Sequence, residues 1–211
     1  MINQAFHELL NDYLNTKHRK KVEIITKAFN FANQAHKGIK RRSGEPYIMH
    51  PIAVASIVCN EIGLGSTSIC AALLHDVVED TKFTEEDIRR EFGDEVALLV
   101  DGVTKLTQLD YVADKVEVQA ENLRKMFLAM AKDIRVILIK LADRLHNMRT
   151  MQYQTPKKQK EKSRETLDIY APIADRLGIS KVKVELDDLA FKYLEPEMYN
   201  QLVSSLSLIH I

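Results

Sequence analysis

Residues that break helices are scarce in this chain. Its 211 residues include only 7 glycines and 5 prolines. Folds built mainly from β-hairpins need many tight turns, and glycine and proline supply the backbone angles that these turns require. No hairpin signal and no internal repeat stands out in the sequence. The composition therefore excludes a turn-rich β-sandwich or β-barrel and favours a helical protein.

Cysteine is also rare, and its two positions exclude several chemistries. Cys59 and Cys70 lie among apolar neighbours, in SIVCNEI and SICAALL. They do not have the C-x-x-C spacing of a zinc site, and neither has a neighbour that would activate a nucleophile. The sequence likewise contains no P-loop, no G-x-S-x-G elbow and no glycine-rich dinucleotide fingerprint. We expect two reduced thiols in the core.

The chain has no excess of charge of either sign. It contains 30 basic and 30 acidic residues, and this balance gives no indication of a nucleic-acid or membrane partner. No stretch approaches the roughly 20 consecutive apolar residues that cross a bilayer, and no basic and then apolar leader opens the sequence. We therefore predict a cytoplasmic protein that binds neither a membrane nor, directly, nucleic acid.

Apolar residues make up 45% of the chain and recur at helical spacing. Val22, Ile25 and Phe29 form one such series, which predicts an amphipathic helix. Residues 134–151 are apolar enough to form a long central helix, although their first part, VILI, could also be a buried strand. The periodicity that continues beyond this part favours the helix. The pattern predicts an all-α fold.

Several residues mark where helices begin and end. Thr84 with Asp87 resembles a capping box, in which each residue satisfies a backbone amide of the other. Gly93 resembles a helix stop, with Asp94 as the next N-cap. Pro156 suits the first turn of another helix, where its missing amide hydrogen costs nothing.

An apolar helix turns abruptly acidic in the segment ALLHDVVED, residues 72–80. His75 and Asp76 are followed one turn later by Glu79 and Asp80, so the four groups occupy two adjacent faces of a helix. Burying such charges without a partner is costly, and they are normally paired or bound to a metal. One pair could hold a cation while the other positions a water. The alternative is a solvated acidic helix end, with the histidine partnered in the core.

A further carboxylate follows an apolar run in KLADRLHNMRT, residues 140–150. Asp143 there needs a partner, which is either a metal or an arginine of the same helix. Asn147 and Thr150 fall on its face and place neutral hydrogen-bonding groups beside it. His146 is left outside the predicted ligand set, because a lone histidine in a helix is more often structural.

Basic residues stand near these acidic groups. Arg144 and Arg149 are candidate cations for phosphate, which arginine can bind bidentately. His50, directly before Pro51 at a helix start, follows the basic loop KGIKRRSGEPY, residues 37–47. That loop could receive phosphates or stack an arginine on a base, although an ordinary solvated loop fits its charge equally well. Imidazole and carboxylate ligands together suit manganese, iron, zinc or nickel.

These residues lie in stretches that resemble the N-terminal hydrolase domain of the long RelA/SpoT homologues, the bifunctional (p)ppGpp synthetase/hydrolases. The matching stretches are RRSGEPYIMHP, LLHDVVEDT, VDGVTKL, KDIRVILIKLADRLHNMRT and RETLDIYAPIADRLGI. They cover most of the chain from about residue 37 to residue 194. The resemblance implies an all-α, HD-domain phosphohydrolase helical bundle with manganese, Mn²⁺, as its cofactor.

The resemblance also implies a role for each matching residue. The implied metal ligands are His50, His75, Asp76 and Asp143. The acidic pair that orients and activates the attacking water is Glu79 and Asp80. The implied nucleotide contacts are Arg41, Arg42 and Ser43 for the guanine and Asn147 and Thr150 for ribose and base, and we add Arg144 as a cation for phosphate. The HD-x-x-ED motif is intact, which argues for a competent enzyme.

The resemblance further divides the chain. Residues 1–155 are the expected HD-type hydrolase core, and residues 156–196 resemble the connector that leads into a synthetase domain. Residues 197–211 include an abrupt loss of charge and look like a truncated or foreign tail. Within the core, residues 104–115 are polar and are predicted to form a loop near the site. We therefore expect a fragment of a longer protein, whose full-length form would engage the ribosome.

The function that follows is manganese-dependent hydrolysis of the 3′-pyrophosphate of ppGpp and pppGpp, with GDP or GTP and pyrophosphate as products. The guanine nucleotide alarmones are then the expected partners. Two alternatives stay open. One is an HD phosphohydrolase that acts on another nucleotide, and the other is a non-catalytic module that binds an alarmone or a partner such as the ribosome.

Overall fold

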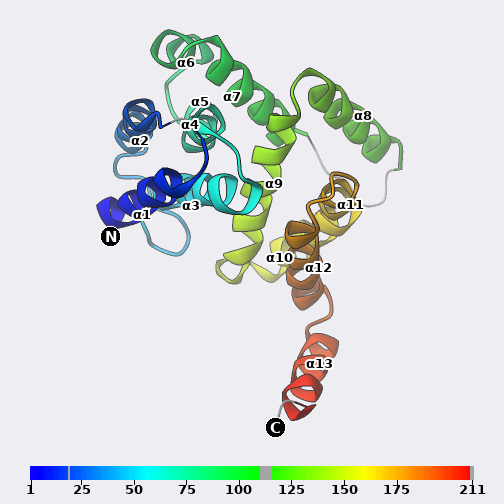
Figure 1. Ribbon diagram of the computed structural model, residues 1–211. Coiled ribbons are helices and arrows are strands. Elements are labelled where there is room, and N and C mark those ends of the chain that lie inside the picture. The colour runs from blue at the N-terminus through cyan, green and yellow to red at the C-terminus, as the bar shows by residue number, and fades with distance from the viewer. Residues whose placement is uncertain (19, 110–115, 210–211) are drawn as a thin grey trace.

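The protein is a bundle of helices arranged around one central helix (Figure 1). The computed structural model describes residues 1–18, 20–109 and 116–209. Over these ranges the regular structure is helical, and the only β-type pairing is an isolated bridge between Lys40 and Pro46. This confirms the all-α prediction.

The first half of the bundle consists of short helices. They are α1 (Ile2–Asn15), α2 (Val22–Ala35), α3 (Met49–Ile57), the π-helical turn η1 (Val58–Ile62), α4 (Ser66–Leu74), α5 (Val77–Asp80), α6 (Glu85–Phe92) and α7 (Asp94–Thr107). The second half is α8 (Val116–Lys132), α9 (Ile134–Arg149), η2 (Met151–Tyr153), α10 (Pro156–Glu165), η3 (Thr166–Tyr170), α11 (Ala171–Arg176), α12 (Ser180–Leu194) and α13 (Pro196–Ile209). Helix α13 extends away from the rest of the molecule (Figure 1).

Helix α9 forms the centre of the core. It packs against α3, α4, α7, α8 and α12, and it is buried on several faces at once. Its apolar residues Val136, Ile137, Ile139, Leu141, Ala142, Leu145 and Met148 are buried among these neighbours, and so are the charged Lys140, Asp143 and Arg144. The predicted central helix is thus confirmed, although its last residues, from Met151, continue as the short helix η2.

The crossing of α7 and α9 is unusually close. A Cβ atom added to Gly102 would lie 2.7 Å from Cγ2 of Val136. Such a distance is well inside normal carbon–carbon contact, so only a residue without a side chain fits at this crossing. Further along the same two helices, Thr107 at the end of α7 accepts a hydrogen bond from Lys140, three residues before Asp143 in α9.

Most of the helix boundaries predicted from the sequence are found in the structure. The capping box is confirmed, since Oγ1 of Thr84 accepts a hydrogen bond from the Asp87 amide at 3.3 Å and the Asp87 carboxylate accepts one from the Thr84 amide. Pro156 is the first residue of α10. Gly93, with φ of 86°, is the N-cap of α7, so the prediction that Asp94 would take this position was wrong.

The predicted loop at residues 104–115 was too long. Helix α7 continues to Thr107, and the hydroxyls of Thr104 and Thr107 donate to the carbonyls of Val100 and Val103. These bonds keep polar side chains inside the helix, and the apolar face of α7 goes on through Leu106. Residues 110–115 of the predicted loop lie outside the described residues.

The helices after residue 155 share the core of the rest of the bundle. Ile169, Tyr170 and Leu186 belong to the same buried cluster as the apolar residues of α9. A buried ion pair also joins the two parts, with Nη2 of Arg144 2.6 Å from Oε1 of Glu165. The division at residue 155 stays a prediction.

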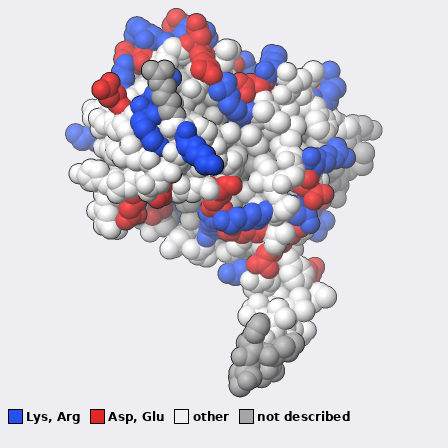
Figure 2. Space-filling model, viewed as in Figure 1, with Lys and Arg blue, Asp and Glu red and all other residues white. Residues whose placement is uncertain are grey.

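The remaining global expectations concern thiols, membranes and charge. Cys59 and Cys70 are both buried and unpaired, as predicted, and burial raises the pKa of Cys70 to about 12. No helix within the described residues has the length and apolar character needed to cross a membrane. On the face shown in Figure 2, acidic and basic side chains are interspersed.

Candidate metal centre and active site

The HD segment lies at a break between two helices. Helix α4 ends just before His75, and the chain turns through His75 and Asp76 before α5 begins. The continuous helix that the sequence suggests is therefore interrupted. Because nearly all of α4 is buried, the turn brings His75 into the interior, where 1% of its surface is exposed. Helix α5 then carries Glu79 and Asp80 back to the surface.

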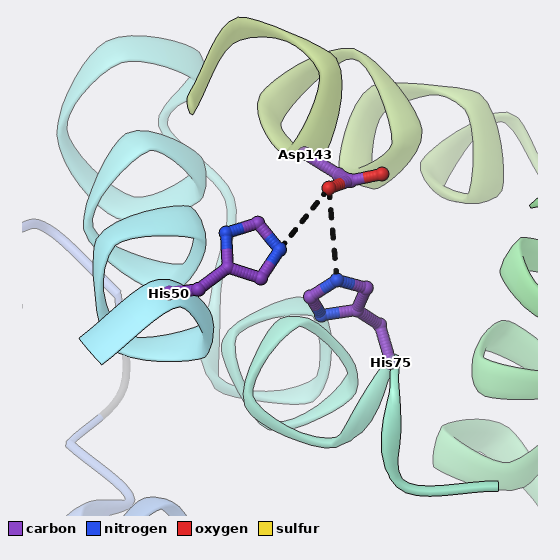
Figure 3. Close-up of side chains that lie close together, drawn as sticks. All are labelled: His50, His75 and Asp143. Atoms are coloured by element: carbon purple, nitrogen blue, oxygen red, sulfur yellow. Dashed lines mark ion pairs between the residues drawn. The ribbon is translucent and has the colours of Figure 1, made fainter. Parts of the chain in front are cut away.

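Three side chains from distant parts of the sequence meet at this turn. His50 comes from the first turn of α3, His75 from the end of α4 and Asp143 from the middle of α9. One nitrogen or oxygen atom of each lies within 4.8 Å of those of the others, and all three residues are buried. Figure 3 shows both imidazole rings directed toward the carboxylate. Oδ1 of Asp143 is 3.2 Å from Nε2 of His50 and 3.8 Å from Nε2 of His75.

Asp76 lies against the same two histidines. Its Oδ2 atom is 3.1 Å from Nε2 of His75 and 3.5 Å from Nε2 of His50. The hydroxyl of Tyr47 donates a hydrogen bond of 2.8 Å to this oxygen and so orients the carboxylate. The four residues predicted as metal ligands are thus brought together, with two imidazole nitrogens and two carboxylates facing one another.

The tautomer of His75 leaves a lone pair inside the cluster. Nδ1 of His75 lies 2.7 Å from the carbonyl oxygen of Ala72, which can only accept, so Nδ1 carries the hydrogen. In the neutral ring Nε2 is then unprotonated, and this buried atom has no hydrogen-bond partner. An orphaned lone pair between carboxylates is the arrangement expected for a histidine that binds a cation.

Protons compete with a cation for this position. Burial lowers the pKa of His75, but the neighbouring carboxylates of Asp76 and Asp143 outweigh burial and raise it to about 9. Burial raises the pKa of Asp143, but Lys140 and the two histidines hold it well below its usual range. The carboxylates are therefore charged near neutral pH, and the cluster attracts positive charge, either as a proton or as a metal ion.

Lys140 supplies a fixed cation beside the cluster. Its Nζ atom donates to Oδ2 of Asp143 at 2.8 Å and to Oγ1 of Thr107 at 2.9 Å, and the side chain is buried. The charged partner of Asp143 within its own helix is thus a lysine, where the sequence suggested an arginine as the alternative to a metal. Lys140 binds Oδ2 of this carboxylate, and Oδ1, which also accepts a hydrogen bond from Asn147, faces the histidines.

A cavity of about 300 Å³ opens over these residues. Its acidic lining residues are Asp76, Glu79, Asp80, Asp143 and Glu165, and its basic ones include Lys140, Arg144, Lys158 and Lys162. Glu79 is exposed to the cavity, and partial burial together with the charge of Asp76 raises its pKa. The cavity therefore combines a carboxyl group suited to accept a proton with cations suited to phosphate.

The family description "HD domain" matches residues 28–180, which contain every residue of the cluster. The chain belongs to the HD-domain family. An HD domain implies a divalent metal, and the buried His50, His75 and Asp143, with the half-buried Asp76 beside them and an unpartnered Nε2 atom on His75, fit such an ion.

Similar proteins place this HD domain among the RelA/SpoT homologues, which confirms the resemblance seen in the sequence. The chain is 56% identical over 179 residues to a GTP pyrophosphokinase of Streptomyces coelicolor, covering 85% of this chain and 21% of that protein. It is 54% identical over 171 residues to a guanosine-3′,5′-bis(diphosphate) 3′-pyrophosphohydrolase of Haemophilus influenzae, covering 81% and 25%. It is 50% identical over 196 residues to the bifunctional (p)ppGpp synthase/hydrolase SpoT of Escherichia coli, covering 93% and 27%.

The chain also matches a solved structure over almost the whole length of that structure. That structure is described as a metazoan ortholog of SpoT that hydrolyses ppGpp and plays a role in starvation responses. The match has a TM-score of 0.61 and 30% sequence identity, and it covers 83% of this chain and 97% of the other. The curated relatives named above are much longer, and the chain spans only 21% to 27% of their length.

The predicted nucleotide contacts of the HD domain are only partly in the cavity. Arg41, Asn147, Thr150 and Arg144 line it. Arg42 is exposed and Ser43 is half-buried, and neither belongs to the cavity lining. Arg144 is buried, pairs with Glu165 and stacks on the Tyr170 ring at 4.2 Å. These roles stay predictions.

Arg149 does not take the position that the sequence suggested. Its guanidinium donates to Glu185 at 2.6 Å and to Glu61 at 2.9 Å, and it does not contribute to the cavity lining. These two carboxylates come from α12 and from η1. Arg149 therefore joins α9 to its neighbours and is not available to phosphate.

Two residues of the HD domain went unnoticed in the sequence. Lys140 stands three residues before Asp143, a spacing that places the two side chains on one helix face and could have revealed the pair. Tyr47 stands three residues before His50, but nothing in that spacing shows that its hydroxyl reaches Asp76 from the loop before α3. His146, omitted from the ligand set, lies beside His50 with Nδ1 atoms 2.7 Å apart.

Proposed function

We propose that this chain hydrolyses the 3′-pyrophosphate of ppGpp and pppGpp, with GDP or GTP and pyrophosphate as products, and that Mn²⁺ is its metal. The observation that carries the proposal is the buried His–Asp cluster beside a cavity lined by both acidic and basic side chains. Relatives that carry the names 3′-pyrophosphohydrolase and (p)ppGpp synthase/hydrolase support the choice of substrate.

The donor set suits manganese. Two imidazole nitrogens from His50 and His75 and carboxylates from Asp76 and Asp143 form a mixed nitrogen and oxygen site, and no thiolate is present to favour a softer ion. When bound, the ion lowers the pKa of a water and polarises a phosphoryl oxygen. Tyr47 and Lys140 keep the two carboxylates in place from the outside of the cluster.

Glu79 and Asp80 act as the general base that accepts the proton of the attacking water. They stand at the edge of the cavity, on the helical turn that follows Asp76. The raised pKa of Glu79 brings its carboxylate closer to the range in which a group accepts and returns a proton near neutral pH. The water oxygen bonds to the phosphorus attached to the ribose 3′ oxygen, that ester bond breaks, and the proton passes to the departing 3′ oxygen.

Basic side chains that line the same cavity stabilise the charge on the phosphoryl oxygens. Lys158 and Lys162 lie one turn apart on α10 and line the cavity together with Arg144 and Lys140. Fixed cations placed where negative charge develops are the main source of catalysis in phosphoryl transfer. Arg41, Asn147 and Thr150 hold the nucleoside, so we expect loss of Arg41 to weaken substrate binding.

The names of the relatives include a synthetic activity that the cavity does not favour. A GTP pyrophosphokinase moves a pyrophosphoryl group between nucleotides, and the chain covers 21% of the relative that carries this name. A metal-ligand cluster with an adjacent acidic pair is suited to activate water, which is the chemistry of hydrolysis. The proposal for this chain is therefore hydrolysis alone.

The test is pyrophosphate release from ppGpp by the purified chain, with Mn²⁺ and with a chelator. We expect release that needs the metal and that falls sharply in Asp80→Asn. Asp187→Asn is the matched control, because this carboxylate lies on the surface of α12 and pairs only with Lys183 in the ion pairs of that helix. Turnover near normal in Asp80→Asn would overturn the role of that residue.

Two other results would point to the alternative functions. If the chain binds ppGpp but releases no pyrophosphate with any divalent metal ion tested, a non-catalytic alarmone-binding module is favoured. Absence of both binding and release, with hydrolysis of another nucleotide in a panel of deoxynucleoside triphosphates and cyclic nucleotides, would favour a different HD phosphohydrolase.

A further inference from the structure

The side chain of Arg41 connects the basic loop to the metal cluster. Its Nη1 atom lies 3.2 Å from Nδ1 of His146, and its Nη2 atom donates to Oδ1 of Asn147 at 2.9 Å. Each of these two neighbours contacts a predicted metal ligand. Nδ1 of His146 is 2.7 Å from Nδ1 of His50, and Nδ2 of Asn147 donates to Oδ1 of Asp143 at 2.6 Å.

The contact between the two Nδ1 atoms needs a single hydrogen. At 2.7 Å, one nitrogen must donate and the other must accept. The guanidinium of Arg41 has donors and no acceptor, so Nδ1 of His146, which faces it, is the acceptor. Nδ1 of His50 is therefore the donor, and in the neutral ring its Nε2 carries a lone pair directed at the cluster.

The carboxylates favour the opposite tautomer of His50. Nε2 of His50 is 3.2 Å from Asp143 and 3.5 Å from Asp76, so a hydrogen on Nε2 would gain a charged acceptor. A ring with its hydrogen on Nε2 cannot bind a cation through that atom. An acceptor at Nδ1 is therefore needed to hold the hydrogen on the far side of the ring.

His75 and His50 have different hydrogen-bond acceptors at Nδ1. His75 has a main-chain acceptor, the carbonyl of Ala72 within the same helical segment, which is present whenever the helix is formed. The acceptor for His50 is the side chain of His146, 96 residues away, and its acceptor state depends on Arg41 from a third segment. Only the His50 tautomer is linked to the basic loop.

We propose that His146 is a positioning residue that holds His50 in its metal-binding tautomer, and that Arg41 fixes His146 as the acceptor. The inference rests on the proposed metal site and extends it, because it makes metal affinity depend on a residue of the nucleotide loop even when no nucleotide is bound. Removal of an outer partner of a metal-binding histidine commonly lowers metal affinity about 10- to 100-fold.

The test is titration of the metal-free, nucleotide-free chain with Mn²⁺, followed by calorimetry. We expect His146→Phe to weaken binding by about 10- to 100-fold. His146→Asn should bind nearly as tightly as the original chain, because its amide oxygen can accept the same hydrogen bond. Arg41→Ala should also weaken binding, whereas Lys40→Ala, which removes an exposed cation from the same loop, should not.

A second measurement separates the hydrogen bond from packing. Nitrogen NMR of the metal-free protein distinguishes a ring with hydrogen on Nδ1 from one with hydrogen on Nε2. We expect His50 to carry its hydrogen on Nδ1 in the original chain and in His146→Asn, and on Nε2 in His146→Phe. Thermal unfolding of each variant confirms that it is folded.

Three results would overturn the inference. The first is a folded His146→Phe variant that binds Mn²⁺ as tightly as the original chain. The second is a His146→Asn variant that binds Mn²⁺ as weakly as His146→Phe. The third is a His50 ring that keeps its hydrogen on Nδ1 in His146→Phe as well as in His146→Asn. The proposed function fails separately, when Mn²⁺ binds with the expected dependence on His146 but no pyrophosphate is released from ppGpp. Absence of Mn²⁺ binding to the original chain would overturn both.

Discussion

Replacement of Glu165 by glutamine tests how the buried ion pair holds α9 to α10. Both Arg144 and Glu165 are buried, and Nη2 of the arginine is 2.6 Å from Oε1 of the carboxylate. Glu165→Gln keeps the size and shape of the side chain but removes its charge. The guanidinium then remains in the interior beside the Tyr170 ring without a carboxylate to balance it.

The expected loss of stability follows from this burial. Breaking one partner of a buried pair costs about 3–5 kcal/mol, because the other charge stays desolvated and unpaired. A chain of this size loses about 2–4 °C in Tm for each kcal/mol, so the expected decrease in Tm is about 6–20 °C. Replacement of both residues by apolar side chains, in Arg144→Met with Glu165→Leu, should recover most of the loss, because neither charge of this pair then remains buried.

The pH dependence has a defined direction. Burial raises the pKa of Glu165, but Arg144 and Lys162 outweigh burial and lower it below its usual value. A carboxyl whose folded pKa is lowered stabilises the protein fully above its unfolded pKa, about 4.3, and loses that contribution as pH falls through the folded pKa. The difference between the original chain and Glu165→Gln should therefore be constant from about pH 8 to pH 5 and shrink only below about pH 4.3.

Chemical denaturation at several pH values measures this difference directly. Glu161→Gln is the control, since this residue lies exposed on the same helix and its replacement should change the free energy of unfolding by about 0.5 kcal/mol or less. A loss below about 1 kcal/mol in Glu165→Gln would refute the reasoning, because it would place the pair among surface ion pairs. A difference that shrinks between pH 7 and pH 5 would contradict the lowered pKa of Glu165.

Four further outcomes follow from the structure. Asp143→Ala should abolish detectable Mn²⁺ binding in calorimetry, and full metal occupancy would remove it from the ligand set. Affinity for Mn²⁺ should rise by up to about tenfold per pH unit between pH 7 and pH 9 and then level off, because His75 must lose a proton to bind. Asp80→Asn should lower kcat about 100- to 10,000-fold while ppGpp binding, measured separately, is largely kept. Gly102→Ala should lower Tm, because its Cβ would lie 2.7 Å from Val136; an unchanged Tm would show that α7 and α9 can separate without cost.

Local patterns were enough to predict most helices. The series Val22, Ile25 and Phe29 and the capping box at Thr84 lie within single elements, and short-range hydrogen bonds and side-chain periodicity decide such features. The error at residues 104–107 has the same kind of cause. Threonine hydroxyls that bond to carbonyls one turn earlier let α7 continue where a polar loop was expected.

Pairing between distant segments was not visible in the sequence. Arg149 and Arg144 are separated by five positions and have the same side chain, yet one is held by Glu61 and Glu185 and the other lines the cavity. The Tyr47 hydroxyl on Asp76 is a contact of the same kind. Which carboxylate reaches a given side chain depends on how helices cross, and residue spacing along one helix does not encode this.

The sequence by itself determined the fold class and predicted the types of metal ligand. Few glycines and prolines, helical apolar periodicity and the intact HD-x-x-ED motif are properties of composition and spacing, and they indicated a helical HD protein with histidine and aspartate at its site. Only the tertiary structure decided that His50, His75 and Asp143 face one another, that Lys140 takes one carboxylate oxygen, and that His146 and Arg41 set the proton on His50. Hydrogen bonds act over about 3 Å, and packing of α3, α4 and α9 is what brings these distant residues within that range.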